Sequence, residues 1–340
     1  MSKLLLGVDI GASNIKVIGL KEKKDGFVVS HVLIAPTPPS VYVEGAVIDH
    51  GALAKAVHDL VRSAKGTEKD AAFALKGNDV IVKKVHLPWN GKGNFTEEFL
   101  WSAEQYIGLS TEKATFDAQL LRFDPERQSA EAVVAAAPKD KVADLLNVAS
   151  QAGLNPVVMD IEALALVNLV TKLKGSQKHV NAVIDIGYDE VRVIFFENGV
   201  VDMIKTLPKG GKSLAEELAS DMDSDPEKAE AIIRSSESMS TDADAQAAAM
   251  AYGNSLGSEI ETLVDIYMQE RSKEPVDFFV CGAVSYVAEV VENIETSMGV
   301  GVTHIDPFKY IELPDALRGV IDDCGAGTFA LATGLAMRKA

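Results

Sequence analysis

The sequence has few of the features that mark several common classes of protein. It contains only two cysteines, Cys281 and Cys324, which excludes a disulfide framework and favours a reducing compartment. No apolar run approaches the roughly 20 residues that cross a bilayer, and residues 1–6 lead into a hairpin too early for a signal peptide. The six histidines show no metal-binding spacing. We therefore expect a cytoplasmic chain without direct membrane insertion.

Positive charge is also scarce. The chain has 33 lysines and arginines against 50 aspartates and glutamates, which gives a formal net charge of −17. Nucleic acids and acidic membranes are bound through basic patches, so we expect neither as a partner. The 340 residues, 47% of them hydrophobic, are enough for two globular domains with sizeable cores.

One pattern occurs twice, in residues 8–17 and 184–193. Asp185 lies 176 residues after Asp9, and at this spacing glycine matches glycine (Gly11 and Gly187) and apolar positions match apolar positions. Each copy predicts a strand, a tight turn entered by Asp-x-Gly, and a second strand. Similarity at a domain-sized spacing indicates two related domains rather than a short repeat.

Such a hairpin can bind an anion with its metal ion. Glycine permits a positive φ, so the turn can expose successive N–H groups that form a concave anion site. Asp9 and Asp185, at the strand ends, could hold Mg²⁺ through water. Two such hairpins facing each other across a cleft would grip a polyphosphate. The alternative is a pair of ordinary turns; the matched pair favours binding.

Periodicity and turn residues predict an inserted module within the first of the two domains. The first domain is expected to contain strands at 4–10, 14–21, 27–34, 71–75 and 156–160 and helices at 51–64 and 161–172. The module, 76–153, is expected to contain strands at 79–87, 115–123 and 130–137, a helix capped by Thr96 and ended by Gly108, and a helix at 140–152.

The second domain opens with the repeated hairpin. This domain is expected to contain that hairpin at 180–197, strands at 200–206, 276–280 and 300–305, and helices at 213–221, 226–234, 244–271 and 284–297. A polar loop is expected at 235–240. The nearly apolar last helix, 326–338, should be buried against the first domain.

The segment Lys209–Ser213 fails the P-loop pattern, because Thr206 stands where that pattern needs glycine. Ser213 with Glu216 instead predicts a capping box at a helix start. Lys212 at this helix N-terminus could still approach a nucleotide.

Two strand-to-helix junctions carry further candidates. The small residues of Val280–Ala283 would let the backbone approach a flat ligand such as adenine, although close strand–helix packing is the favoured explanation for this segment taken alone. Asp160 and Glu162 could orient an attacking water, although acidic residues at a helix start are also favourable with the helix dipole.

With these segments placed, the chain resembles the actin-like ATPase superfamily, and within it the type IV pilus assembly family PilM. The resemblance covers nearly the whole chain. The stretches that carry it, besides the two hairpins, are 80–88, 103–107, 152–158, Gly210–Gly211, 304–308 and 330–338. The inserted module resembles the one that PilM shares with the division protein FtsA.

This resemblance implies an α/β actin-like two-domain fold, built from duplicated ribonuclease H-like domains, with an FtsA/PilM-type α+β insertion in the first domain. It implies a first domain of residues 1–75, 154–176 and 306–340, the insertion 76–153, and a second domain of 177–305. ATP with Mg²⁺ would lie between the halves, with at most weak ATPase activity.

The resemblance also implies roles for individual residues. Asp9 and Asp185 would hold the metal ion, and Glu162 is the catalytic candidate. The nucleotide would be bound by Gly11, Ala12, Ser13, Asn14, Lys16, Gly187, Tyr188, Gly210, Gly211, Lys212, Gly282 and Ala283.

The partners implied are the N-terminal cytoplasmic peptide of PilN, the inner-membrane alignment complex and the motor ATPases, which would make the chain peripheral to the inner membrane. The chain departs from the family pattern at Tyr188, where a small residue is usual, and at Cys281, where glycine is common. Asp189 and Glu190 add carboxylates near the expected γ-phosphate position. A small-molecule kinase and a nucleotide-free interaction protein are the alternative functions.

Overall fold

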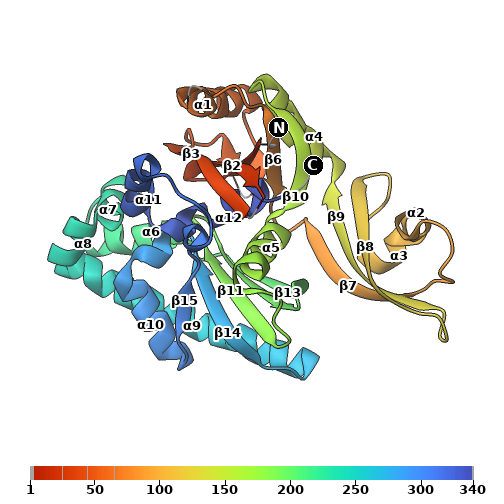
Figure 1. Cartoon of the computed structure of the whole chain (residues 1–340). Helices are drawn as coiled ribbons and strands as arrows, with labels where there is room; N and C mark the ends of the chain where they lie inside the picture. The colour runs from red at the N-terminus through yellow and green to blue at the C-terminus, as the bar shows by residue number, and fades with distance from the viewer. Residues whose placement is uncertain (1–3, 25, 44, 65, 339–340) are drawn as a thin grey trace. The chain divides into compact units, whose positions relative to one another are not determined.

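The computed structural model describes residues 4–24, 26–43, 45–64 and 66–338, apart from the side chains of residues 236–238. Residues 1–3, 25, 44, 65, 339 and 340, all of the predicted first domain, lie outside these ranges. Contacts divide the chain, whose helices and strands are labelled in Figure 1, into two compact units. Unit 1 comprises residues 1–169, 199–204 and 331–340, and unit 2 comprises 170–198 and 205–330.

Unit 1 is built on a five-stranded sheet with the order β10-β6-β1-β2-β3. These strands are β1 (Leu4–Ile10), β2 (Asn14–Lys23), β3 (Gly26–Pro36), β6 (Asp70–Leu75) and β10 (Asn155–Ile161). The strands β1, β2 and β3 form an antiparallel meander, and β6 and β10 then join β1 in parallel. The parallel strands β1, β6 and β10 therefore end at the same edge of the sheet.

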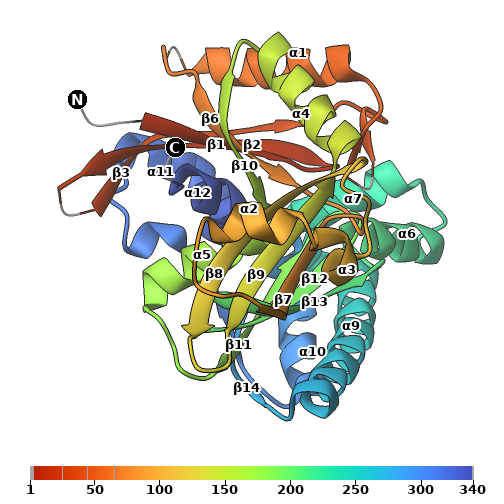
Figure 2. The ribbon, with the colours of Figure 1, turned by 90° about the vertical axis from the view of Figure 1, so that its right-hand side faces the viewer.

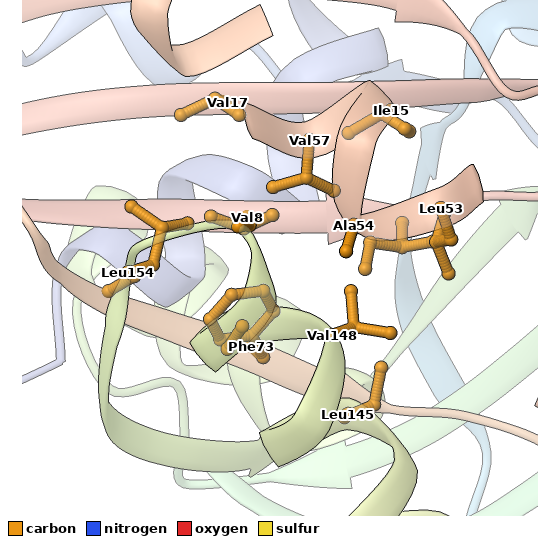
Figure 3. Close-up of a cluster of buried hydrophobic side chains, with 14 of the residues drawn as sticks. Val8, Ile15, Val17, Leu53, Ala54, Val57, Phe73, Leu145, Val148 and Leu154 are labelled. Atoms are coloured by element: carbon orange, nitrogen blue, oxygen red, sulfur yellow. The ribbon is translucent and has the colours of Figure 1, made fainter. Parts of the chain in front are cut away.

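Two helices cover one face of this sheet, α1 (His50–Ser63) and α4 (Lys139–Gln151). Successive side chains of a strand point to opposite faces, and Val8 of β1 meets Val57 of α1 and Val148 of α4 in the buried core of Figure 3. A two-stranded hairpin, β4 (Tyr42–Val43) with β5 (Ala46–Val47), was not predicted; it precedes α1.

The other face of β1 receives the last helix, α12 (Ala330–Ala336). A Cβ on Gly7 would overlap the backbone of Ala332, so only glycine allows this approach. Gly334 packs as closely on Ala165 of α5 (Glu162–Lys174). These contacts, and the grouping of residues 331–340 with unit 1, confirm the expected burial of the last helix.

Within unit 1, residues 81–138 form a separate three-stranded antiparallel sheet with the order β7-β9-β8. Its elements are β7 (Ile81–Pro88), α2 (Phe95–Leu100), α3 (Ala103–Ile107), β8 (Ala114–Asp124) and β9 (Ser129–Pro138). Figure 2 shows α2 and α3 against one face of this sheet, where they share a core of their own. These elements match the strands and the first helical segment expected in the inserted module 76–153. The helix expected in that module at 140–152 is α4, and it packs instead on the five-stranded sheet of unit 1, because its apolar face joins the core of that sheet.

The second five-stranded sheet, to which unit 2 contributes β11, β12, β14 and β15, repeats the topology of the first with the order β13-β12-β11-β14-β15. The strands are β11 (Val180–Ile186), β12 (Val191–Glu197), β13 (Val200–Leu207), β14 (Pro275–Cys281) and β15 (Val302–His304). Again an antiparallel hairpin, β11–β12, is joined by two strands that run parallel to its first strand. The duplication read from the two Asp-x-Gly stretches therefore extends over both sheets.

The helices of unit 2 are α6 (Gly211–Asp221), α7 (Pro226–Arg234), α8 (Ser236–Thr241), α9 (Ala243–Arg271), α10 (Ala288–Met298) and α11 (Arg318–Cys324). Short 3₁₀ turns occupy Ala283–Tyr286, Pro307–Lys309, Asp315–Leu317 and Ala326–Phe329. The helices α9 and α10 lie side by side (Figures 1 and 2), and Gly253 and Gly257 bring α9 against the backbone of α10.

Several local predictions were wrong. The expected polar loop at 235–240 is largely the helix α8. The expected helix capped by Thr96 is two helices, and Asn94 caps the first, because its side chain accepts from the N–H groups of Thr96 and Glu97. The helices expected at 284–297 and 326–338 each begin as a 3₁₀ turn. Apart from α8, these errors concern helix ends, where local hydrogen bonds decide the boundary.

Candidate functional site

The first hairpin, between β1 and β2, closes as the sequence predicts. Asp9 lies directly opposite Lys16, and the N–H of Gly11 donates to the carbonyl of Asn14 over 3.0 Å. Thr37, beyond β3, fixes the loop: its hydroxyl donates to the carbonyl of Gly11 (2.6 Å) and its N–H to that of Ser13 (3.0 Å). The loop 11–14 is thus held rigidly, and one of its N–H groups is used internally.

Asp9 lies within a buried group of charges. Its Oδ2 is 3.0 Å from the Nζ of Lys16, and its Oδ1 is 2.5 Å from the Nζ of Lys76. The same Lys76 Nζ lies 3.8 Å from Oε2 of Glu162, whose side chain is almost fully buried. Burial alone would raise the pKa of Asp9, but the ammonium groups of Lys16 and Lys76 outweigh it and hold that pKa far below its usual range.

The topology of unit 1 explains why these four side chains meet. Asp9 is near the end of β1, Lys76 follows β6, and Glu162 follows β10, so all three stand at the same edge of the parallel strands. Lys16 reaches Asp9 from the neighbouring strand β2. Ligand sites of α/β sheets lie at the carboxyl ends of the strands. The sequence interpretation included three of these residues and missed Lys76.

Asp160, the other predicted carboxylate at this junction, has a structural partner. Its Oδ2 is 3.0 Å from Nε of Arg338, just after α12, and its Oδ1 accepts from the N–H of Ile161. Burial raises the pKa of Asp160, against the effect of Arg338. Asp160 therefore anchors the last helix, while Glu162 stands at the start of α5, where an acidic side chain is also favourable with the dipole.

The second hairpin, between β11 and β12, has the same backbone. Asp185 lies opposite Arg192, and the N–H of Gly187 donates to the carbonyl of Glu190 over 3.0 Å. Its side chains differ: Arg192 pairs with Glu190, and the thiol of Cys281, from β14, lies 3.5 Å from Oδ1 of Asp185. Cys281 is buried.

The start of α6 packs onto this hairpin. The N–H groups of Gly211 and Lys212 donate to the carbonyls of Gly187 and Tyr188, both over 2.9 Å. A Cβ on Gly210 would overlap the backbone of Tyr188, which explains the glycine. The Nζ of Lys212 is 3.9 Å from Glu216, and both side chains are more than half exposed.

The predicted capping box of Ser213 was wrong. The helix α6 starts at Gly211, with Gly210 at its N-cap and no side-chain cap, so Ser213 lies inside the first turn. The hairpin carbonyls replace a capping side chain, because they accept the first N–H groups of the helix from another part of unit 2.

Gly282 follows β14 and takes a φ of 93°. A Cβ there would overlap the carbonyl of Ile186, so the segment Gly282–Ala283 packs directly on the end of β11. The N–H of Gly282 donates to Gly327, and the N–H of Gly327 donates to the Tyr286 hydroxyl over 2.6 Å. Close packing thus explains the small residues here, and it also brings the segment to the Asp185 hairpin.

Comparison with known protein families shows to which family the chain belongs. The family described as type IV pilus assembly protein PilM matches residues 7–340. The chain belongs to the PilM family. Similar solved structures include a PilM–PilN type IV pilus biogenesis complex, which is 24% identical, covers 98% of each chain and gives a TM-score of 0.85.

Two further structures show how widely the fold of this PilM-family chain is shared. The ethanolamine utilization protein EutJ from Carboxydothermus hydrogenoformans is 15% identical over 99% of this chain and 90% of its own, with a TM-score of 0.64. MreB 5 of Spiroplasma citri bound to AMPPNP is 10% identical over 98% and 95%, with a TM-score of 0.53. The predicted actin-like fold is confirmed.

Asp9 and Asp185 are the candidate Mg²⁺ ligands of this PilM-family chain. Among the described residues, no group of three or more histidine, cysteine, aspartate or glutamate side chains could hold a metal ion. Asp9 offers the carboxylate oxygens that Mg²⁺ prefers, but both already contact ammonium groups. The residues therefore fit Mg²⁺ only if an ammonium group moves away or water lies between.

Two residues that the sequence interpretation missed, Lys76 and Thr37, contact the first hairpin. Lys76 directly follows a strand parallel to β1, and Thr37 is a buried hydroxyl just beyond β3. Both residues directly follow a strand, and this position was the sequence signal that could have identified them as site residues. Among the residues that the structure describes, no helix is both long and apolar enough to cross a membrane.

Proposed function

We propose that this PilM-family chain is an ATP-binding scaffold of type IV pilus assembly, in which the nucleotide state controls the binding of the N-terminal cytoplasmic segment of PilN. The observation that carries this proposal is the duplicated hairpin. Asp9 and Asp185 occupy the same register, opposite a basic residue, and the two loops close through the same backbone hydrogen bond. Family membership supplies the pilus context.

Each unit contributes its own set of nucleotide-binding residues. In unit 1, the loop Gly11–Asn14 and Lys16 bind phosphate, Asp9 serves the metal ion, and Glu162 orients an attacking water. The support for this set is its position at the carboxyl edge of β1, β6 and β10. Lys16 and Lys76 favour an anion there, because their partly shielded ammonium groups interact more strongly with it than fully solvated ones would.

In unit 2, the loop Gly187–Tyr188 binds phosphate and Asp185 serves the metal ion through water. Gly210, Gly211, Lys212, Gly282 and Ala283 line the nucleoside. The support for this set is that α6 and the Gly282 segment both pack directly on the second hairpin. The MreB 5 structure was solved with AMPPNP, which supports a nucleotide in this fold. Mg²⁺ completes the charge balance of a bound triphosphate.

The partner side of the proposal rests on the family. A related PilM has been solved with PilN, and we propose that the corresponding segment binds beside the inserted module 81–138. The scaffold would thereby join the inner-membrane alignment complex to the motor ATPases, at the cytoplasmic side of the membrane. Hydrolysis, where it occurs, is slow and resets the scaffold.

Calorimetric titration tests both ligands together. Mg-ATP is titrated into the full chain with and without a PilN N-terminal peptide, and the peptide with and without Mg-ATP. We expect both to bind and each to change the affinity of the other by the same factor, as linkage requires. Peptide binding without ATP binding would leave an interaction protein without a nucleotide, and ATP binding without peptide binding would favour a small-molecule kinase.

Two variants assign the binding to the proposed residues. Lys16→Gln removes a positive charge from the first hairpin, so the affinity for Mg-ATP should fall while the peptide affinity in the absence of nucleotide stays unchanged. Lys273→Gln removes a lysine that pairs with Glu197, away from both hairpins, and should leave both affinities as in the parent. Equal ATP affinity in the two variants would contradict the assignment.

A further inference from the structure

The segment that carries Lys76 connects the five-stranded sheet of unit 1 to the inserted module. The strand β6 ends at Leu75, Lys76 follows it, and Gly77 takes a φ of 109°. A turn closes where the N–H of Val80 donates to the carbonyl of Gly77 over 3.1 Å, and β7 then begins. The chain leaves the module through β9 and enters α4 at Lys139. Lys76 therefore stands where the chain enters the module, and the start of α4 stands where it leaves.

Lys141 joins these two connections of the module. Its Nζ donates to the carbonyl of Lys76 over 2.8 Å and also pairs with Asp79. Lys141 lies in the first turn of α4, where a positive charge is unfavourable with the helix dipole. Only 11% of its side chain is nevertheless exposed. The contacts with the segment 76–79, and not the needs of the helix, therefore account for this lysine.

A second element also confines the backbone of Lys76. The turn between β4 and β5 has Gly45 at a φ of 81°, and a Cβ on Gly45 would lie only 2.6 Å from the carbonyl oxygen of Lys76. This hairpin therefore packs directly on the carbonyl group that Lys141 binds. From this fixed backbone, the Nζ of Lys76 reaches Oδ1 of Asp9 over 2.5 Å, while Oδ2 of the same carboxylate is 3.0 Å from the Nζ of Lys16.

We propose that Lys141 is a positioning residue for the phosphate side of the nucleotide site, because it fixes the backbone of Lys76, and Lys76 in turn fixes Asp9. A lysine side chain loses much rotamer freedom when its ammonium group is held at one point. A fixed backbone leaves only the side chain to be ordered. The Lys76 ammonium then adds positive charge at the site and leaves the other oxygen of Asp9 to orient Lys16. The inference rests on the proposed nucleotide-binding function and adds a residue to it.

Lys139 provides a matched control in the same helical turn. Its Nζ donates to the carbonyl of Thr111 over 2.9 Å, so it holds a loop of the module and not the segment of Lys76. Lys139→Met and Lys141→Met thus remove the same charge from the same end of α4 and break contacts in different places.

The affinity of the full chain for Mg-ATP, measured by calorimetry, gives the first comparison. We expect Lys141→Met to bind about three- to tenfold more weakly than the parent, within the range of couplings between contacting residues, and Lys139→Met to bind as the parent does. Lys141→Arg keeps donors for the carbonyl of Lys76 and for Asp79, so it should restore most of the affinity. Parent affinity in Lys141→Met, or an equal loss in Lys139→Met, would overturn the proposal.

A double-mutant cycle shows whether Lys141 acts through Lys76. In the Lys76→Met background, Lys141→Met should lower the Mg-ATP affinity by less than in the parent, because the side chain that Lys141 positions is then absent. Losses that simply multiply would show an effect independent of Lys76 and would overturn the proposal. If Lys141→Met does not fold, which circular dichroism would show, Asp79→Ala takes its place in the cycle, because it weakens the same contact from a half-exposed partner.

Urea denaturation of the same four proteins tests the positioning role without nucleotide. Lys141→Met should lower the free energy of unfolding less in the Lys76→Met background than in the parent, since part of its effect is a weaker contact between Lys76 and Asp9. If no protein binds ATP but these losses are less than additive, the proposed function fails and the positioning role stands. If the parent binds ATP and the losses are additive in both cycles, the positioning role fails alone. If the parent does not bind ATP and the losses are additive, both fail.

Discussion

The two hairpins of this chain have the same backbone and different charges. Asp9 and Asp185 each stand opposite a basic residue, and each following loop closes by an N–H of glycine donating to the carbonyl three residues on. Asp9 carries two lysines, whereas Asp185 has the thiol of Cys281 beside it. Duplication has thus preserved the turn geometry, while the electrostatic environment of each aspartate has diverged.

The two hairpin loops also differ in charge and in side-chain size. At the repeat spacing, Ala12, Ser13 and Asn14 of the first loop correspond to Tyr188, Asp189 and Glu190 of the second. The first loop is therefore small and uncharged beside the two partly buried lysines Lys16 and Lys76. The second loop is larger and carries two carboxylates, one of which pairs with Arg192. If the proposed nucleotide binds, we expect unit 1 to supply most of the attraction for its phosphates.

The first strands of the two hairpins, β1 and β11, differ at one position because different elements pack on them. Gly7 in β1 corresponds to Val183 in β11, which is fully buried. The backbone of α12 lies on β1 at Gly7 and leaves no room for a side chain. Glycine at this position of the repeat therefore marks unit 1 as the unit on which the last helix packs.

The largest difference between the hairpins should appear on removal of each aspartate. Asp9→Ala would remove a buried carboxylate that two largely shielded lysines contact, and breaking a buried ion pair costs about 3–5 kcal/mol. Asp185 is only partly buried, so Asp185→Ala should cost clearly less. Urea denaturation followed by circular dichroism measures both free energies of unfolding.

A control identifies the cause of this loss. Asp9→Asn keeps the volume of the side chain but removes its charge, and it should also be strongly destabilising if charge is responsible. Stability of Asp9→Asn close to the parent would show that the lysines are accommodated without Asp9. Equal losses of unfolding free energy in Asp9→Ala and Asp185→Ala would contradict the proposed electrostatic difference between the two hairpins.

A smaller effect is expected where α12 meets β1. In Gly7→Ala the new methyl group would overlap the backbone of Ala332, and forced overpacking of this kind costs roughly 1–3 kcal/mol. Gly319 on α11 provides the matched control, because a Cβ there meets nothing within 4 Å. Gly319→Ala should be neutral or slightly stabilising in the same urea measurement. Equal stability of both variants would show that α12 adjusts freely on the sheet.

The strands and both turns could be predicted because their signals are local. Alternating apolar residues around Asp9 and Asp185 fix the strands, and Asp-x-Gly fixes the turns. Lys76 could not be found in this way, since it reaches Asp9 only because β6 pairs in parallel with β1. The same limit explains α6: its first N–H groups bind the carbonyls of a distant hairpin, so the Ser213 pattern indicated a cap that the helix does not use.

The smallest predicted effect compares the corresponding helices of the two units, α1 and α6. Asp49 caps α1, because its side chain accepts from the N–H of Ala52 over 2.9 Å. Asp49→Ala should therefore cost about 1 kcal/mol, as the loss of a capping side chain usually does. Ser213→Ala should cost less than about 0.5 kcal/mol, since surface changes away from caps and cores rarely exceed that. A larger loss for Ser213→Ala than for Asp49→Ala, in thermal unfolding of the two variants, would show that the hairpin carbonyls do not anchor α6 on their own.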